Sequence, residues 1–139
     1  PLNCCRDEKD SIREFLVFHG EYMRKETNGR YLIEKISEEI KSNKQKYKII
    51  TDVRYDDYQA DEVSWLKNEL NGILIHVSMV GLDGELIGPA NSAEARNNPK
   101  LIEKADFKVR CPLKEKTSNL HKELSPYVEE VMFQAGIGY

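Results

Sequence analysis

The chain has little cysteine, no long apolar run and no large excess of charge of either sign. Its 139 residues include 3 cysteines, of which Cys4 and Cys5 are adjacent, a poor geometry for a mutual disulfide. None of the 3 histidines lies at a metal-ligand spacing from a cysteine, so no structural zinc site is expected. The absence of a disulfide framework favours a reduced cytoplasmic protein.

Hydropathy and charge exclude several classes of partner. No apolar run approaches the roughly 18 residues of a membrane span, and the N-terminus shows no signal-peptide core. The 21 basic and 24 acidic residues give a net charge of −3, which argues against a protein that coats nucleic acid or a polybasic membrane-binding protein. We therefore expect neither nucleic acid nor a membrane as partner. With 40% hydrophobic residues, the composition predicts one globular domain over 1–139.

Apolar periodicity predicts an α/β fold, with a short parallel sheet and flanking helices. An irregular lead-in over residues 1–10 is followed by helices predicted over 11–26, 30–42, 58–70, 99–103 and 117–133. Strands are predicted over 47–53, 73–80 and 105–109. Asp56 and Asp57 are the predicted caps of the helix that starts at residue 58. Residues 81–99 are rich in Gly, Asn and Pro and predict a long loop that resembles a lid, with at most a turn of helix over 92–96.

The end of the first predicted strand carries the best candidates for chemistry. Ligands of open α/β sheets collect beyond the carboxyl ends of the strands, where Asp52 and Arg54 lie. Asp52 can orient water on a Mg²⁺ ion, and Arg54 can bind a phosphate through two parallel hydrogen bonds. An Asp–Arg pair that merely closes a turn explains the same residues equally well. Arg24, beside Glu21, is a second candidate phosphate ligand, and a solvated basic face is its alternative.

Motifs for other kinds of catalysis are missing. The sequence contains neither G-x-x-x-x-G-K-[ST] nor G-x-G-x-x-G, so no recognisable phosphate-cradling loop is encoded. Ser64 and Ser78 lack a nucleophile motif such as G-x-S-x-G. His19 and His76 lie among apolar residues, and we interpret both as structural histidines.

Five segments occur in an order and spacing that are more specific together than any one alone. They are Arg13–Leu16 with Gly20 and Glu21, Arg24 with Tyr31–Ile33, Ile50–Tyr55 with Asn71–Val77, Ser92–Ala95, and Ala105–Val109. Together they resemble the part of a phage-type deoxynucleoside monophosphate kinase that follows the P-loop. The strand–DxR–helix–strand pattern around Asp52 and Arg54 is the most specific part of the resemblance. This family is a branch of the P-loop kinases.

The resemblance implies phosphoryl transfer from ATP to a deoxynucleoside monophosphate, with Mg²⁺ as cofactor. It implies that Asp52 lies at the Walker-B-like position and places Mg²⁺ through water. Arg54 would contact phosphate between the two nucleotides. The resemblance also puts Glu21 and Arg24 on the monophosphate-acceptor side and Arg96 near the mobile lid.

Two departures from the family limit this expectation. The family's N-terminal strand, P-loop and first helix have no counterpart here, so no kinase turnover is expected from this polypeptide alone. The loop after the last strand, Asn-x-Gly-Ser/Thr-Leu in the family, begins here as Arg110-Cys111-Pro112-Leu113. Three interpretations stay open. The chain is a piece of a larger kinase, or a degenerate relative of one, or an unrelated α/β protein. A degenerate relative would bind a nucleotide, or would bind a protein partner or a second copy through an exposed sheet edge.

Overall fold

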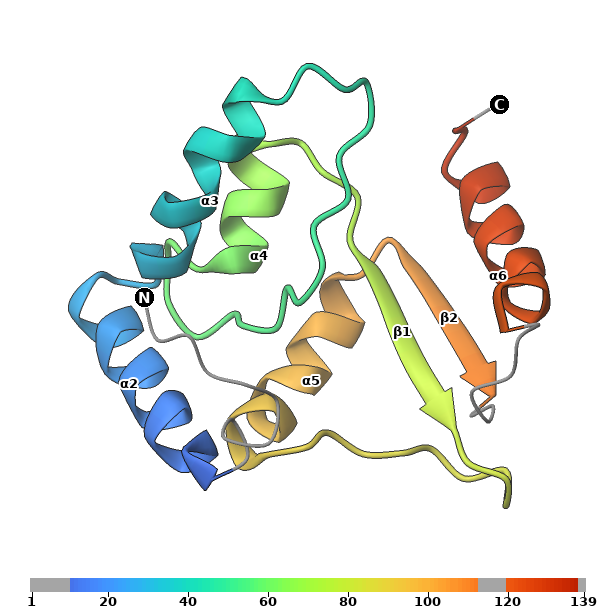
Figure 1. The fold of residues 1–139 in the computed structure, drawn as a ribbon, viewed down its shortest axis with the longest axis horizontal. Coiled ribbons are helices and arrows are strands. Elements are labelled where there is room, and N and C mark those ends of the chain that lie inside the picture. Colours follow the sequence, from blue (N-terminus) through green and yellow to red (C-terminus); the bar gives the residue numbers. More distant parts are fainter. Residues whose placement is uncertain (1–10, 113–119, 138–139) are drawn as a thin grey trace. The chain divides into compact units, whose positions relative to one another are not determined.

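The computed structural model describes residues 11–112 and 120–137, which belong to two compact units (Figure 1). The first unit ends at Trp65 and the second begins at Leu66. A single domain over 1–139 stays a prediction, and the predicted lead-in over 1–10 lies outside the described residues.

The described part of the first unit begins with two helices, as predicted. Helix α2 spans Arg13–Glu26 and helix α3 spans Arg30–Ser42, and the two helices contact each other. Gly29 turns the chain between them at φ +93°, a left-handed conformation that glycine adopts without steric cost. A Cβ at this position would lie 2.8 Å from Cα of Asp61, so the close approach of the backbone also requires glycine.

The strand predicted over 47–53 is wrong, because residues 43–61 form neither helix nor strand. A strand needs a neighbour to pair its backbone N–H and C=O groups, and this segment has none. Asp52 has φ +64°, which interrupts an extended backbone, and the side chain of Ile49 is 91% exposed. The chain therefore contains no βαβ unit built on this segment.

The helix predicted over 58–70 is shorter than expected. It consists of α4, Glu62–Ser64, and the π-helical turn η1, Trp65–Glu69. The predicted caps Asp56 and Asp57 lie before this helix without capping it. Asp61 takes that position, because its carboxylate accepts a hydrogen bond from the backbone N–H of Glu62 at 3.1 Å.

A parallel pair of strands is the centre of the second unit and confirms the α/β class. Strand β1, Ile75–Val80, pairs with β2, Phe107–Pro112, and Ile75 lies opposite Phe107 in the register. Figure 1 shows the two strands side by side, and α6, Leu120–Gln134, contacts β2. The resemblance to P-loop kinases concerns finer detail than this architecture and stays a proposal.

Helix α5, Ser92–Lys104, connects the two strands and is longer than predicted. The lid-like loop predicted over 81–99 therefore ends at Asn91. The Asn91 side chain accepts a hydrogen bond from the N–H of Glu94 at 2.9 Å and so caps the helix at an earlier residue. The prediction that Pro99 opens a short helix is wrong, because Pro99 lies inside α5.

Hydrophobic burial is limited in both units. The buried apolar side chains are Ile33, Val63 and Trp65 in the first unit, and Leu66, Leu74 and Ala93 in the second. On β1 the apolar side chains of Ile75, Val77 and Met79 are the more exposed ones. Among the described helices, none has the length and apolar character that a membrane crossing requires.

Candidate functional site

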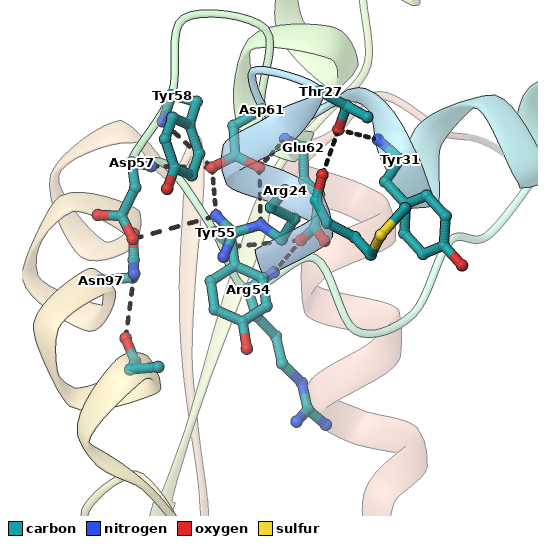
Figure 2. Close-up of polar contacts among 12 residues, drawn as sticks. Arg24, Thr27, Tyr31, Arg54, Tyr55, Asp57, Tyr58, Asp61, Glu62 and Asn97 are labelled. Carbon is teal, nitrogen blue, oxygen red and sulfur yellow. Dashed lines mark hydrogen bonds and ion pairs between the residues drawn. The ribbon is translucent and has the colours of Figure 1, made fainter. Parts of the chain in front are cut away.

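A buried ion pair in the first unit joins α2 to the segment before α4. The Nη2 atom of Arg24 lies 2.5 Å from Oδ2 of Asp61, and Nε of Arg24 lies 3.4 Å from Oδ1 (Figure 2). The Arg24 side chain is 2% exposed and that of Asp61 is 0% exposed. Because neither charge reaches water, each depends on the other for compensation.

Aromatic rings complete the surroundings of the Arg24 guanidinium. Its Cζ atom lies 3.6 Å from the centre of the Tyr55 ring and 5.5 Å from the centre of the Tyr58 ring. Both distances fall within the range of a cation–π interaction, which strengthens when the cation is desolvated. Asp57 adds a second carboxylate, with Oδ2 at 4.0 Å from Nη2 of Arg24. Arg24 is thus held by carboxylates and aromatic faces together.

Asp61 also fixes the backbone of the loop that precedes it. Its Oδ2 atom accepts hydrogen bonds from the N–H of Asp57 at 2.9 Å and of Tyr58 at 3.3 Å. One buried carboxylate therefore orders residues 57–58, caps α4 and neutralises Arg24. These hydrogen bonds give partners to backbone N–H groups of the loop, which forms neither helix nor strand.

Glu62 fixes the neighbouring part of the same loop. This buried carboxylate accepts hydrogen bonds through Oε2 from the backbone N–H of Arg54 at 2.7 Å and of Tyr55 at 3.2 Å. Burial raises the pKa of Glu62, and the Asp61 charge raises it further, whereas the Arg54 N–H and the Arg24 charge lower it. Together these effects raise the pKa of Glu62 above the ordinary value for glutamate. As the pH falls, Glu62 therefore takes up a proton at a higher pH than an exposed glutamate does.

Arg54 directs its side chain away from this cluster, as Figure 2 shows. Its Nη2 atom lies 2.7 Å from Oδ1 of Asp52, and the two side chains are 46% and 71% exposed. The structure therefore brings the predicted pair Asp52 and Arg54 together, with both side chains partly in solvent. The backbone N–H of Arg54 is held by Glu62. The partly exposed Arg54 side chain therefore extends from a fixed position in the loop.

The other predicted site residues occupy different parts of the chain. Glu21 is half-buried on α2, in the same unit as Arg24 and Arg54. Arg96 is exposed on α5, in the second unit. Arg24 is buried rather than facing solvent, and the substrate-binding role of Glu21, Arg24 and Arg96 stays a prediction.

Asp61 and Glu62 were not among the predicted site residues, although they organise the loop. Their signal in the sequence is an Asp at an N-cap position followed by an acidic first turn. That signal predicts a helix start and does not reveal a contact with Arg24, which lies 37 residues earlier.

The surroundings of Asp52 are compatible with the implied magnesium ion. Within residues 11–112 and 120–137 no group of three or more His, Cys, Asp or Glu side chains is arranged to hold a metal. Mg²⁺ keeps several waters and often uses one or two carboxylates together with substrate phosphates. The exposed carboxylate of Asp52 suits that mode of binding, next to the arginine that is predicted to bind phosphate.

His76 on β1 has a hydrogen-bond partner at each ring nitrogen. Nε2 lies 2.8 Å from Oδ1 of Asn98, and Nδ1 lies 3.3 Å from Oγ of Ser78. An Nε2–H tautomer satisfies both contacts, with the ring donating to Asn98 and accepting from Ser78. This geometry agrees with the interpretation of His76 as a structural histidine.

Comparison with known proteins found no family model, no curated protein and no solved structure that matches this chain.

Proposed function

We propose that this chain binds a deoxynucleoside monophosphate as the acceptor part of a nucleotide kinase, with Arg54 as the phosphate ligand. The observation that carries the proposal is the state of Arg54. Its backbone N–H donates a hydrogen bond to buried Glu62, while its side chain is 46% exposed and its guanidinium pairs with Asp52. A partly exposed arginine with a fixed backbone suits the recognition of a phosphate, because its planar guanidinium can donate two parallel hydrogen bonds.

The remaining residues have supporting roles in this proposal. Asp52 would hold Mg²⁺ through water, and the ion would supply neutralisation of phosphate charge. In-line phosphoryl transfer depends on positioning and charge stabilisation rather than covalent chemistry, which arginines can provide. Glu21 would lie on the acceptor side, and Arg24, 2% exposed in its ion pair with Asp61, would support that side from inside the protein. ATP would be the phosphoryl donor, and the sequence printed here has no Walker A motif to cradle its phosphates.

Calorimetric titration of the 139-residue chain with each deoxynucleoside monophosphate, and separately with ATP, tests the proposal in the presence of Mg²⁺. We expect saturable binding of at least one monophosphate. Arg54→Ala should weaken that binding by about 10- to 100-fold, because it removes hydrogen bonds between charged groups. Arg110→Ala, at an exposed arginine on β2, is the matched control and should leave the affinity unchanged.

The result that would contradict the proposal is the absence of binding for every monophosphate, or equal binding by Arg54→Ala. Absence of binding for every monophosphate would favour the second candidate function, a module that binds a protein partner or a second copy, whereas equal binding by Arg54→Ala would exclude Arg54 as the phosphate ligand. The exposed apolar side chains of Ile75, Val77 and Met79 on β1 support that alternative. Light scattering of the same chain over a range of concentrations would measure self-association directly.

A further inference from the structure

We infer that Glu62 is a positioning residue for phosphate binding: its carboxylate sets the placement of the Arg54 guanidinium by holding the backbone of residues 54–55. This inference rests on the proposed function, because it assigns a residue that acts on the ligand through Arg54. Glu62 itself lies inside the protein and does not reach the solvent side of the loop.

Glu62 fixes a point of a segment that forms no regular secondary structure. Residues 43–61 are neither helix nor strand, and Oε2 of Glu62 accepts from two successive backbone N–H groups of that segment. The N–H of Val63 donates a hydrogen bond to the carbonyl oxygen of Tyr55 at 3.4 Å, which is a second link between this part of the loop and α4. Displacement of the Glu62 carboxylate would therefore move the Arg54 backbone directly.

Asp61 and Glu62 hold different parts of the loop, so that Asp61 supports the buried cluster and Glu62 positions Arg54. Asp61 bonds the N–H groups of Asp57 and Tyr58 and pairs with Arg24, so its loss would disturb the buried cluster. Glu62 accepts hydrogen bonds from the backbone N–H groups of Arg54 itself and of its neighbour Tyr55. A change at Glu62 is thus expected to affect Arg54 more than the ion pair of Arg24.

The charge of Glu62 determines the strength of its hydrogen bonds to the N–H groups of Arg54 and Tyr55. A hydrogen bond to an ionised carboxylate is about twice as strong as one to a neutral acceptor. The charged groups that face Glu62 are Arg24 from α2 and Asp61 beside it, and the N–H donors are those of Arg54 and Tyr55. Protonation of Glu62 leaves a neutral acceptor for both N–H groups, so the hold on Arg54 weakens as the pH falls.

Two measurements on the whole chain test the inference, with Glu62→Gln as the variant. The amide NMR signals of Arg54 and Tyr55 should titrate together in the wild type with a midpoint above that of an ordinary glutamate, and Glu62→Gln should abolish this titration. At neutral pH, calorimetry should show that Glu62→Gln binds the monophosphate about 3- to 10-fold more weakly. The matched control is Glu34→Gln, at an exposed position of α3, which should change neither readout.

The pH dependence separates positioning from a general loss of structure. The phosphate of the ligand also titrates near pH 6, and this contribution is common to both proteins. Between neutral pH and pH 4.5, wild-type affinity should therefore fall more steeply than that of Glu62→Gln, and the two should converge. Far-ultraviolet circular dichroism and the dispersion of the remaining amide signals establish that the variant is folded.

The outcomes of these experiments are distinguishable. Equal affinity of wild type and Glu62→Gln, or Arg54 and Tyr55 amides that do not respond to Glu62, overturns the role of Glu62 and leaves the proposed function standing. Absence of monophosphate binding by the wild type overturns the proposed function and with it the positioning role. If Glu62→Gln is unfolded, the NMR titration of the wild type still decides, because Arg54 amide signals that do not titrate overturn the inference.

Discussion

Arg24 on α2 and Asp61 before α4 are 37 residues apart in the sequence and form a buried ion pair with a 2.5 Å contact. The pair joins two segments whose contact cannot be predicted from local sequence patterns. It also places Asp61 where its carboxylate can order residues 57–58. The loop that presents Arg54 therefore depends on a long-range interaction of a different arginine.

Asp61→Asn should strongly destabilise the protein. The substitution leaves the Arg24 charge buried without its main counter-ion and weakens the hydrogen bonds to the loop backbone. We expect the free energy of unfolding to fall by about 3–5 kcal/mol, as measured by chemical denaturation. Glu34→Gln, which removes an exposed carboxylate of the same unit, should change it by less than about 0.5 kcal/mol. A loss below 1 kcal/mol for Asp61→Asn would show that the ion pair is not a main support.

The ring of Tyr55 should contribute to stability through the Arg24 guanidinium. Tyr55→Leu removes the aromatic face that lies 3.6 Å from Cζ of Arg24, whereas Tyr55→Phe keeps that face. We expect Tyr55→Leu to lower the free energy of unfolding by about 2 kcal/mol more than Tyr55→Phe does, because the cation is desolvated. Thermal and urea denaturation of both variants would measure the difference, and equal losses would contradict the cation–π interpretation.

Glu62 should make the stability depend on pH in a defined direction. Its pKa in the folded protein lies above the ordinary value of 4.5, so the folded state binds the proton more tightly than the unfolded state does. The free energy of unfolding therefore contains a contribution that is present below pH 4.5 and is lost as the pH rises through the raised pKa. Urea denaturation from pH 4 to 8 should show this decline in the wild type relative to Glu62→Gln. A difference between the two proteins that does not change with pH would exclude this contribution.

Asp106 should have the opposite pH dependence in the second unit. Burial alone would raise the pKa of Asp106, but hydrogen bonds from the Lys67 ammonium and from the N–H of Leu74 at 2.7 Å outweigh it and lower the pKa. The stability from Asp106 is present above its ordinary value of 3.8 and is lost as the pH falls through the lowered value.

Asp106→Asn should therefore be less stable than the wild type at pH 7 by about 0.5–1 kcal/mol, since the pair with Lys67 is partly exposed. The two proteins should approach equal stability near pH 2, as urea denaturation at both pH values would show. Lys67→Met removes the other member of the pair, and its stability relative to the wild type should be compared at the same two pH values. A stability difference that persists undiminished at pH 2 would mean that the charge of Asp106 is not responsible.

Much of the regular structure could be predicted from local pattern, and the main error has a clear physical origin. The period of Ile33, Ile36 and Ile40, bounded by Gly29, predicted the observed bounds of α3. The apolar run at 47–53 has the composition of a buried strand but stays irregular, because a strand exists only where another strand pairs with it. Composition cannot supply that partner.

The candidate site shows the same division between local and long-range information. Asp52 and Arg54 are two residues apart, and their spacing in the sequence already allowed the contact that the structure shows. The bonds from Asp61 to Arg24 and from Glu62 to Arg54 span 37 and 8 residues and had no periodic signal. They arise because the turn before α4 directs two adjacent carboxylates into the protein.

The sequence by itself determined where helices α2 and α3 lie and which apolar segments become β1 and β2, because periodicity, glycine turns and side-chain patterning act over a few residues. Only the tertiary structure decided that Arg24 is buried against Asp61 and Tyr55, that Glu62 anchors Arg54, and that 47–53 is a loop. These outcomes depend on which groups are desolvated together and which backbone groups find partners, and both are settled only when distant segments meet.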